Sequence, residues 1–208
     1  MVIYDLNPLE GWGFERLIQA LLKKIIGQGV TTFGVGPDGG REATYFGSAN
    51  YPSETNRWTG SWIFQAKFHN IYHNLSSAPK LVLRDLSTEL HKITNVSQRQ
   101  CDNYILATNV PLSSVPRRGT HAKIENIRNQ FKDKVLNIHI WRYDDVCRFL
   151  DDNTDVRQTY RHLITPGDLL SYMMVSPTKR TLREDADAIF RRVNISILSS
   201  ASLLFCIA

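Results

Sequence analysis

The segment from Ser61 to His69, SWIFQAKFH, constrains the fold most, because its residues alternate with the two-residue period of a β-strand. The even-numbered residues from Trp62 to Phe68 are all apolar and share one side. On the other side, Gln65 and Lys67 follow one another. We therefore expect a strand with a well-covered face, from which an amide and a lysine emerge next to each other.

Strand and helix patterns alternate along the first 165 residues. We expect strands over residues 30–35, 41–47, 61–69, 102–109 and 135–141, and helices over residues 14–26, 80–93, 143–150 and 156–163, with one more ending near residue 132. In the helix over 80–93 the buried side is expected to carry Leu81, Leu83, Leu86 and Leu90. Residues 48–59 are polar and predict an extended loop. The alternation favours an α/β or α+β fold with a mixed central β-sheet flanked by helices.

The sheet domain is expected to cover residues 1–165, and residues 166–208 a short helical extension. Within it, SPTKR at 176–180 is typical of a linker. The apolar run 195–208 is too short to cross a bilayer comfortably. We interpret it as a buried helix or as the beginning of an element that continues toward a missing C-terminal region.

The balance of charge is mildly basic, with 25 Lys and Arg against 20 Asp and Glu and a pI near 9.2, which favours an acidic partner. Cys101, Cys147 and Cys206 are scattered and have no CxxC spacing, so we expect reduced thiols and no zinc site. The first residues lack the pattern of a signal peptide. These features predict a cytoplasmic protein with no membrane partner.

A second polar cluster, PDGGRE, brings Asp38 and Glu42 one hairpin before Gln65 and Lys67. Phosphodiester hydrolysis needs an activated water and compensation of negative charge on phosphorus, which carboxylate-bound Mg²⁺ supplies. A nearby lysine orients or deprotonates the water and offsets the developing charge. Asp38 and Glu42 are the candidate metal ligands, Gln65 is a neutral ligand or water-holder, and Lys67 is the candidate cation.

Each of these residues also has an ordinary structural interpretation. Asp38 in Pro-Asp-Gly-Gly suits a turn with no further role, and Glu42 suits the solvent face of a strand. Lys67 suits an edge strand, where a lysine discourages aggregation. Glu15, beside the apolar stripe of the first helix, suits a solvated surface. The conjunction of all four favours the functional interpretation.

Glu15, the segment DGGRE at 38–42 and Gln65-Ala-Lys67, in that order, resemble the PD-(D/E)xK nuclease superfamily, and within it the Mrr-like restriction endonuclease branch, where Gln commonly replaces the second acid. The resemblance covers roughly residues 6–165 and implies a restriction-endonuclease-like core. It implies that Glu42, Asp38, Gln65, Lys67 and Glu15 are catalytic. Family members usually place the key acid at the start of the second strand, which points to Glu42, although this chain has Glu where Asp is usual.

The implied activity is a Mg²⁺-dependent endonuclease, with Mn²⁺ as a possible substitute, that cuts double-stranded DNA with little sequence specificity. The chain also resembles nuclease modules fused ahead of NTPases in bacterial antiphage defence proteins, which implies a homo-oligomer activated by assembly. The sequence contains no GxxxxGK[ST] segment, so the NTPase would lie outside it.

Contacts to nucleic acid are expected from the basic cluster formed by Arg117, Arg118, His121 and Lys123, and from Arg57 in the 48–59 loop. A solvated basic loop is the alternative. Three other functions also remain open: a structure-specific or RNA-cutting nuclease, a nuclease-fold module that binds nucleic acid without cutting it, and an interaction scaffold.

Overall fold

The computed structural model describes residues 2–34, 43–74, 76–113 and 119–175. The chain divides into two compact units, Met1–Leu163 and Ile164–Ala208, where the sequence placed a boundary after Thr165. The expected linker at 176–180 and the apolar run at 195–208 lie outside the described residues.

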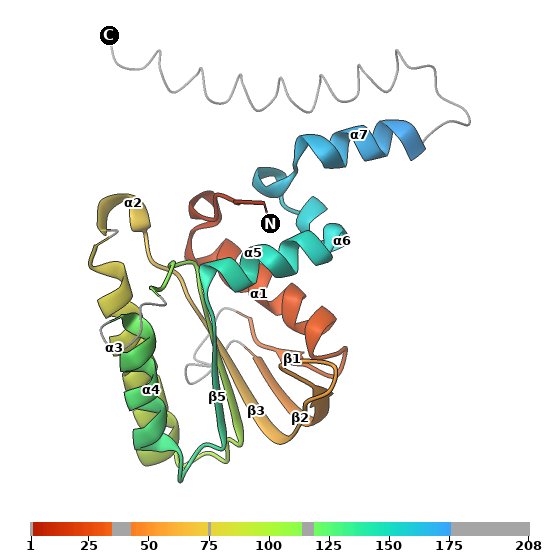
Figure 1. Cartoon of the computed structure of the whole chain (residues 1–208). Coiled ribbons are helices and arrows are strands. Elements are labelled where there is room, and N and C mark those ends of the chain that lie inside the picture. The colour runs from red at the N-terminus through yellow and green to blue at the C-terminus, as the bar shows by residue number, and fades with distance from the viewer. Residues whose placement is uncertain (1, 35–42, 75, 114–118, 176–208) are drawn as a thin grey trace. The chain divides into compact units, whose positions relative to one another are not determined.

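The first unit is built on a five-stranded sheet with the order β1-β2-β3-β4-β5 (Figure 1). Its strands are β1 Thr31–Thr32, β2 Ala43–Asn50, β3 Arg57–Lys67, β4 Asn103–Thr108 and β5 Asn137–Trp141. The first three strands are antiparallel to one another, whereas β3, β4 and β5 run parallel. The predicted mixed central sheet is confirmed.

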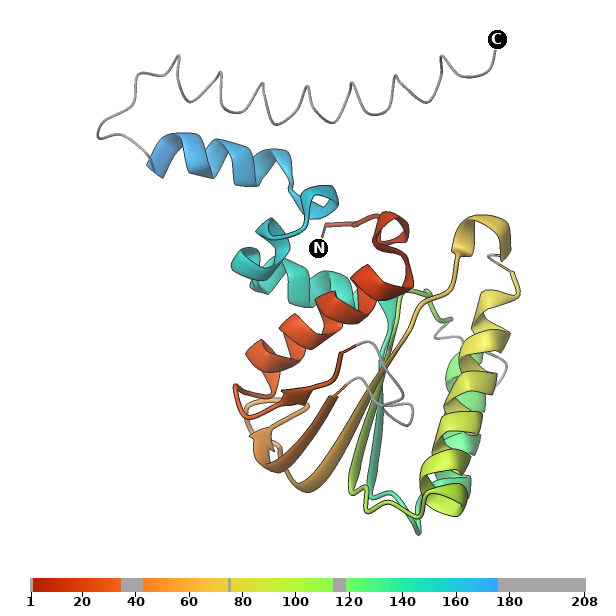
Figure 2. The same cartoon turned by 180° about the vertical axis from the view of Figure 1, so that it is seen from behind.

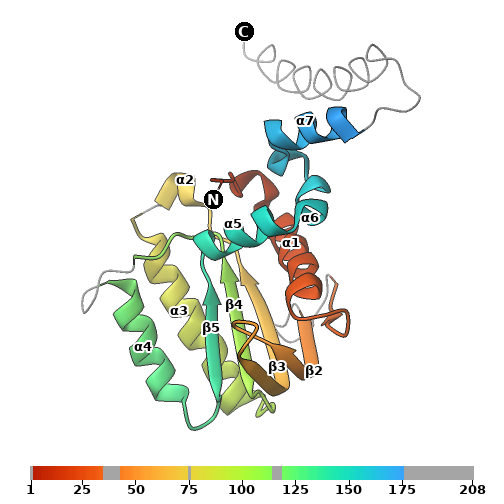
Figure 3. The same cartoon turned by 45° about the vertical axis from the view of Figure 1, so that its right-hand side comes forward.

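Helices cover both faces of this sheet, as predicted (Figures 2 and 3). The helices α1 Glu10–Ile25 and α5 Tyr143–Asp152 lie on one face, and α3 Ala78–His91 and α4 Thr120–Phe131 lie on the other. Shorter helical segments complete the unit: η1 Asn7–Leu9, α2 Ile71–Asn74, η2 Lys92–Val96, α6 Thr154–Gln158 and η3 Arg161–Leu163. Parallel strands require such crossover helices, which is why the second half of the sheet is covered by helices.

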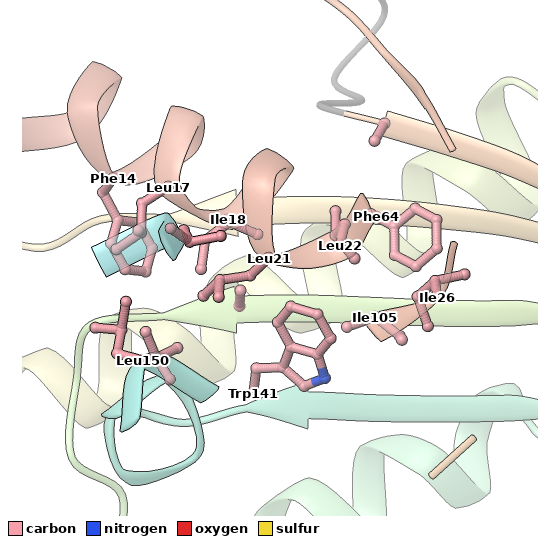
Figure 4. Packing of buried hydrophobic residues seen from close by; sticks show 14 of the residues in the cluster. Phe14, Leu17, Ile18, Leu21, Leu22, Ile26, Phe64, Ile105, Trp141 and Leu150 are labelled. Atoms are coloured by element: carbon pink, nitrogen blue, oxygen red, sulfur yellow. The ribbon is translucent and has the colours of Figure 1, made fainter. Parts of the chain in front are cut away.

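The core on the α1 face follows from the helical spacing of apolar residues in the sequence. Phe14, Leu17, Ile18, Leu21 and Leu22 are buried and form one stripe of α1. Figure 4 shows this stripe packed over aromatic and aliphatic side chains of the sheet, contributed by β3, β4 and β5. The core on this face could therefore be predicted from the helical spacing of apolar residues in the sequence.

The core on the α3 face has a different register from the expected one. Leu81 and Leu83 are only partly buried, whereas Val82 and Glu89 are buried together with Leu86 and Leu90. The buried positions recur at intervals of three and four residues, as one face of a helix requires. The expected stripe was therefore wrong at two positions, and a carboxylate lies where an apolar residue is usual.

The predicted loop over residues 48–59 is also wrong. Strand β2 continues to Asn50 and β3 begins at Arg57, so only residues 51–56 connect them. Ser48 and Thr59 are opposite one another in the hairpin, and their hydroxyl oxygens lie 3.0 Å apart. Polar side chains that suggested a loop instead line the exposed part of an antiparallel pair, where cross-strand hydroxyl bonds are favourable.

In the second unit, the structure describes the helix α7, Pro166–Val175. Its start is fixed by Asp168, whose carboxylate accepts hydrogen bonds from the backbone N–H and the hydroxyl of Thr165, both at 2.7 Å. Proline at the first helical position suits this start, because its missing N–H would have no partner there. Within the described part of the chain, no helix has the length and apolar character needed to cross a membrane.

Candidate active site

Gln65 and Lys67 project from the last part of β3 toward the face that α3 covers. Lys67 is the last residue of β3 and pairs with Thr108 at the end of β4. The side chain of Gln65 is buried, and that of Lys67 is 25% exposed. The predicted strand therefore places the amide and the lysine side by side, near the carboxyl ends of two parallel strands.

Glu89 of α3 is the centre of this group. Its Oε2 accepts a hydrogen bond from Nε2 of Gln65 at 2.9 Å, and its Oε1 lies 3.2 Å from Nζ of Lys67. Nζ of Lys92 reaches the same Oε1 at 3.1 Å. Because this carboxylate is only 9% exposed, the two cations and the amide replace the water that an ionised group would otherwise need.

Tyr104 of β4 fixes the orientation of the amide. Its hydroxyl donates a hydrogen bond to Oε1 of Gln65, and both side chains are buried. With the oxygen facing Tyr104 and the nitrogen facing Glu89, the amide is used as an acceptor and as a donor at once. Gln65 therefore connects two strands and a helix.

The charge of Glu89 follows from these contacts. Burial alone would raise its pKa, but the hydrogen bond from Gln65 and the positive charges of Lys67 and Lys92 lower it by more. The net result is a pKa below the ordinary value, so Glu89 is ionised at neutral pH. A buried carboxylate facing a partly exposed ammonium group is the main electrostatic feature of the site.

His69 continues the same side of the chain just past β3. Its Nε2 lies 3.0 Å from Oδ2 of Asp85, which precedes Glu89 by one turn of α3. The side chain of Asn109 holds the backbone of His69 on both sides, accepting from its N–H at 2.9 Å and donating to its carbonyl at 2.8 Å. Burial lowers the pKa of His69 by more than Asp85 raises it, so the imidazole is neutral at pH 7.

The other predicted catalytic residues are not brought into this cluster by any described contact. Glu15 lies on α1, which packs on the opposite face of the sheet, and its carboxylate accepts a hydrogen bond from Nε2 of Gln19 at 3.2 Å. Asp38 and Glu42 lie outside the described residues.

The predicted nucleic-acid contacts are separated. His121 and Lys123 are exposed near the start of α4, which follows the carboxyl end of β4 and so begins at the same edge of the sheet as Lys67. Arg57 is the first residue of β3, which puts it roughly 30 Å from Lys67 along the strand. Arg117 and Arg118 lie outside the described residues.

A metal site is not complete in the described part of the chain. Among the residues that the structure describes, no group of three or more His, Cys, Asp or Glu side chains is arranged to hold a metal ion. The carboxylate of Glu89 faces three donors, and the amide oxygen of Gln65 faces Tyr104. The ligand set for Mg²⁺ would therefore depend on Asp38 and Glu42.

Sequence reasoning missed Glu89 and Tyr104. Glu89 had a detectable signal, because it falls on the same helical stripe as Val82 and Leu86, where a carboxylate is out of place unless it is paired. Tyr104 had none, since a tyrosine in an apolar strand is ordinary. Its role depends on the parallel pairing of β3 with β4.

No family model matches the chain, and searches of curated proteins and of solved structures found no match either. The functional argument therefore depends on the residues and contacts described above.

Proposed function

We propose that residues 1–163 form a Mg²⁺-dependent endonuclease domain of the PD-(D/E)xK type, which hydrolyses phosphodiester bonds of double-stranded DNA. The observation that carries this proposal is the Gln65–Lys67–Glu89 cluster, in which a partly exposed ammonium group is held by a buried carboxylate at the end of β3. The mixed sheet with helices on both faces is compatible with the restriction-endonuclease-like core that the resemblance implies.

The order of the strands supports the inclusion of Glu42. Ala43, the first described residue of β2, pairs with Phe64, and Gln65 is the next residue of β3. Glu42 directly precedes Ala43 in the sequence. The first described residue of β2 thus lies beside the strand position that precedes Gln65.

In the proposed site, Lys67 places its positive charge where negative charge develops on the phosphate. Glu89 fixes the direction of this lysine, and Gln65 fixes Glu89 in turn. Bound Mg²⁺ would supply an activated water and neutralise the phosphate, with Asp38 and Glu42 as its ligands. His121 and Lys123 would contact the DNA backbone, because both are exposed at the same edge of the sheet.

The biological setting that we propose comes from the resemblance alone. The domain would act as the effector of a cytoplasmic antiphage defence protein, as a homo-oligomer that an NTPase region outside this chain activates. A steep dependence of cleavage on protein concentration would support activation by assembly.

One observation favours a second candidate function, a nuclease-fold module that binds nucleic acid without cutting it. The amide and the carboxylate of the cluster face partners within the protein, so these groups could serve only to hold α3 on β3. In that case the basic residues would bind DNA, and Lys67 would be structural.

Cleavage of supercoiled plasmid separates the two candidates. We expect Mg²⁺-dependent nicking or linearisation by the wild type that EDTA abolishes, and at least a ~100-fold lower rate for Lys67→Ala, since a lost electrostatic contact to the transition state typically costs this much. Lys80→Ala is the matched control, because Lys80 is exposed on α3 and belongs neither to the Gln65–Lys67–Glu89 cluster nor to the basic cluster.

Binding to DNA is measured on the same proteins at low salt, where phosphate contacts are strongest. If Lys67→Ala binds as the wild type does but no longer cuts, the endonuclease proposal holds. A wild type that binds DNA but does not cut it at any protein concentration would instead support the binding module.

A further inference from the structure

A hollow of about 360 Å³ lies at the open edge of the sheet, beside the first residues of β5. It is bounded by Trp58 of β3, by Arg128 and Lys132 of α4, and by Asn137 and His139 of β5. This place is distinct from the Lys67 cluster. Its volume falls in the range of about 300–1,000 Å³ that is typical of small-molecule sites.

His139 is held in place by a chain of two hydrogen bonds through Tyr51. Nε1–H of Trp141 can only donate, and it donates to the hydroxyl of Tyr51 at 2.6 Å. The Tyr51 hydroxyl lies 2.6 Å from Nδ1 of His139, and either group can be the donor of this second hydrogen bond.

The imidazole of His139 is uncharged in this arrangement. Burial, with the charges of Arg128 and Arg142, lowers the pKa of His139 to about 4, although Asp145 opposes this shift. At neutral pH the ring is therefore uncharged and donates through a single nitrogen. Tyr51 is itself buried and holds the ring in place.

The lining of the hollow is basic. It contains two cationic residues, Arg128 and Lys132, and no carboxylate among its described lining residues. Lys132 is exposed. Arg128 binds Glu125 through Nη1, but its Nε–H is shut off from solvent and has no acceptor in the described part of the chain. A buried donor without an acceptor is uncommon in proteins and suggests a missing partner.

Trp58 adds a flat apolar surface to these donors. Its ring packs against Tyr51, with centroids 5.0 Å apart, and lies 6.2 Å from the ring of His139. An aromatic ring held in this way gives a planar base a surface to stack on, while arginine and lysine contact phosphate oxygens. Asn137 also lines the hollow, and its side-chain nitrogen donates to Oδ1 of Asn103 at 2.8 Å.

We propose that this hollow binds a nucleotide, with its base against Trp58 and its phosphate toward Arg128 and Lys132. The cationic side chains suit the phosphate of such a ligand, and the ring of Trp58 suits its base. The same chemistry is present in a free mononucleotide and in one nucleotide of a single strand. The site does not depend on the nuclease proposal, because neither Lys67 nor Glu89 contributes to it.

Isothermal titration calorimetry of the full chain with AMP tests this proposal, with adenosine, inorganic phosphate and a ten-residue oligothymidylate as comparison probes. We expect saturable binding of AMP or of the oligonucleotide, with adenosine and phosphate each bound about 10-fold more weakly or worse, because each lacks one half of the contacts. Saturation by AMP would show that the hollow binds a free nucleotide. Saturation by the oligonucleotide alone would show that it binds a nucleotide within a single strand.

Two variants locate the site. Lys132→Gln changes an exposed side chain and should keep the fold while weakening binding several-fold, and Arg128→Gln with Lys132→Gln should weaken it by about 10-fold or more. Lys80→Gln is the control for charge alone and should bind as the wild type does. The proposal is overturned if neither AMP nor the oligonucleotide saturates in the millimolar range, if phosphate or adenosine binds as tightly as AMP, or if the Lys132→Gln and double variants bind normally.

Discussion

Two polar networks are buried on opposite faces of the sheet, and they are built differently. On the α3 face, Glu89 joins Gln65 and two lysines in a network that carries full charges. On the α1 face, Tyr51 joins Trp141 and His139 in a network of neutral groups. Both networks tie distant parts of the chain together through hydrogen bonds.

The two networks differ in the free energy that is lost when their groups leave water. In the neutral network, the Tyr51 hydroxyl pairs with the N–H of Trp141 and with Nδ1 of His139, and uncharged groups that are paired in this way lose little when they leave water. The charged network must offset the desolvation of an ionised carboxylate, and apolar side chains of similar volume often stabilise a protein as well or better. Stability alone therefore does not explain the charges at this position, and the catalytic role that we propose for Lys67 would explain them.

The largest effect is expected from Glu89→Ala. This change leaves the ammonium group of Lys67 and the amide of Gln65 without their shared partner, and we expect it to lower the free energy of unfolding by about 3 kcal/mol. Urea unfolding followed by circular dichroism measures it. Lys92→Ala removes only an exposed partner of the same carboxylate and should cost about 0.5 kcal/mol. Equal losses in the two variants would contradict the central place of Glu89.

The next largest effect is a pH dependence that separates the networks. The pKa of His139 is lowered to about 4 from 6.5, so its contribution is complete above pH 6.5 and is lost as the pH falls toward 4, because the unfolded chain binds the proton first. At about 1.4 kcal/mol for each pKa unit, we expect a loss of about 2–3 kcal/mol over this window. The pKa of Glu89 lies below its ordinary value of 4.5, so the charged network weakens only below that pH.

Unfolding in urea between pH 4 and 7 measures this loss, and His139→Gln should remove most of it. The remaining slope would come from His69, whose pKa is also lowered by burial, and near pH 4 from Glu89. An unchanged slope in His139→Gln would show that the neutral network does not control acid stability.

The smallest effect is expected from Tyr51→Phe, which removes only the hydroxyl of the neutral network. The buried N–H of Trp141 loses its acceptor, and we expect a loss of about 1–2 kcal/mol in the free energy of unfolding. Thermal unfolding measures it, with Tyr172→Phe on α7 as a control at an exposed tyrosine. A loss as large as that of Glu89→Ala would remove the distinction between the two networks.

Much of the fold could be predicted, because strand and helix periods are local properties of the sequence. The alternation around Gln65 and Lys67 gave a correct strand, and the apolar stripe of the first helix gave the α1 core. The hairpin over residues 48–59 could not be recognised, since its polar residues satisfy one another only across strands. The candidate site was predicted in part for a similar reason. The strand pattern indicated Lys67, but it did not indicate Glu89, which pairs with Lys67 from another element.

The sequence by itself determined which residues alternate, which helix faces are apolar, and that an amide and a lysine share one side of a strand. Only the tertiary structure decided that Glu89 reaches both of them, and that Glu15 lies on the other face of the sheet. It likewise brought Tyr51 to His139, 88 residues away in the chain. The physical reason is that the period of an element fixes the direction of its own side chains, whereas a partner across a sheet depends on how strands and helices pack together.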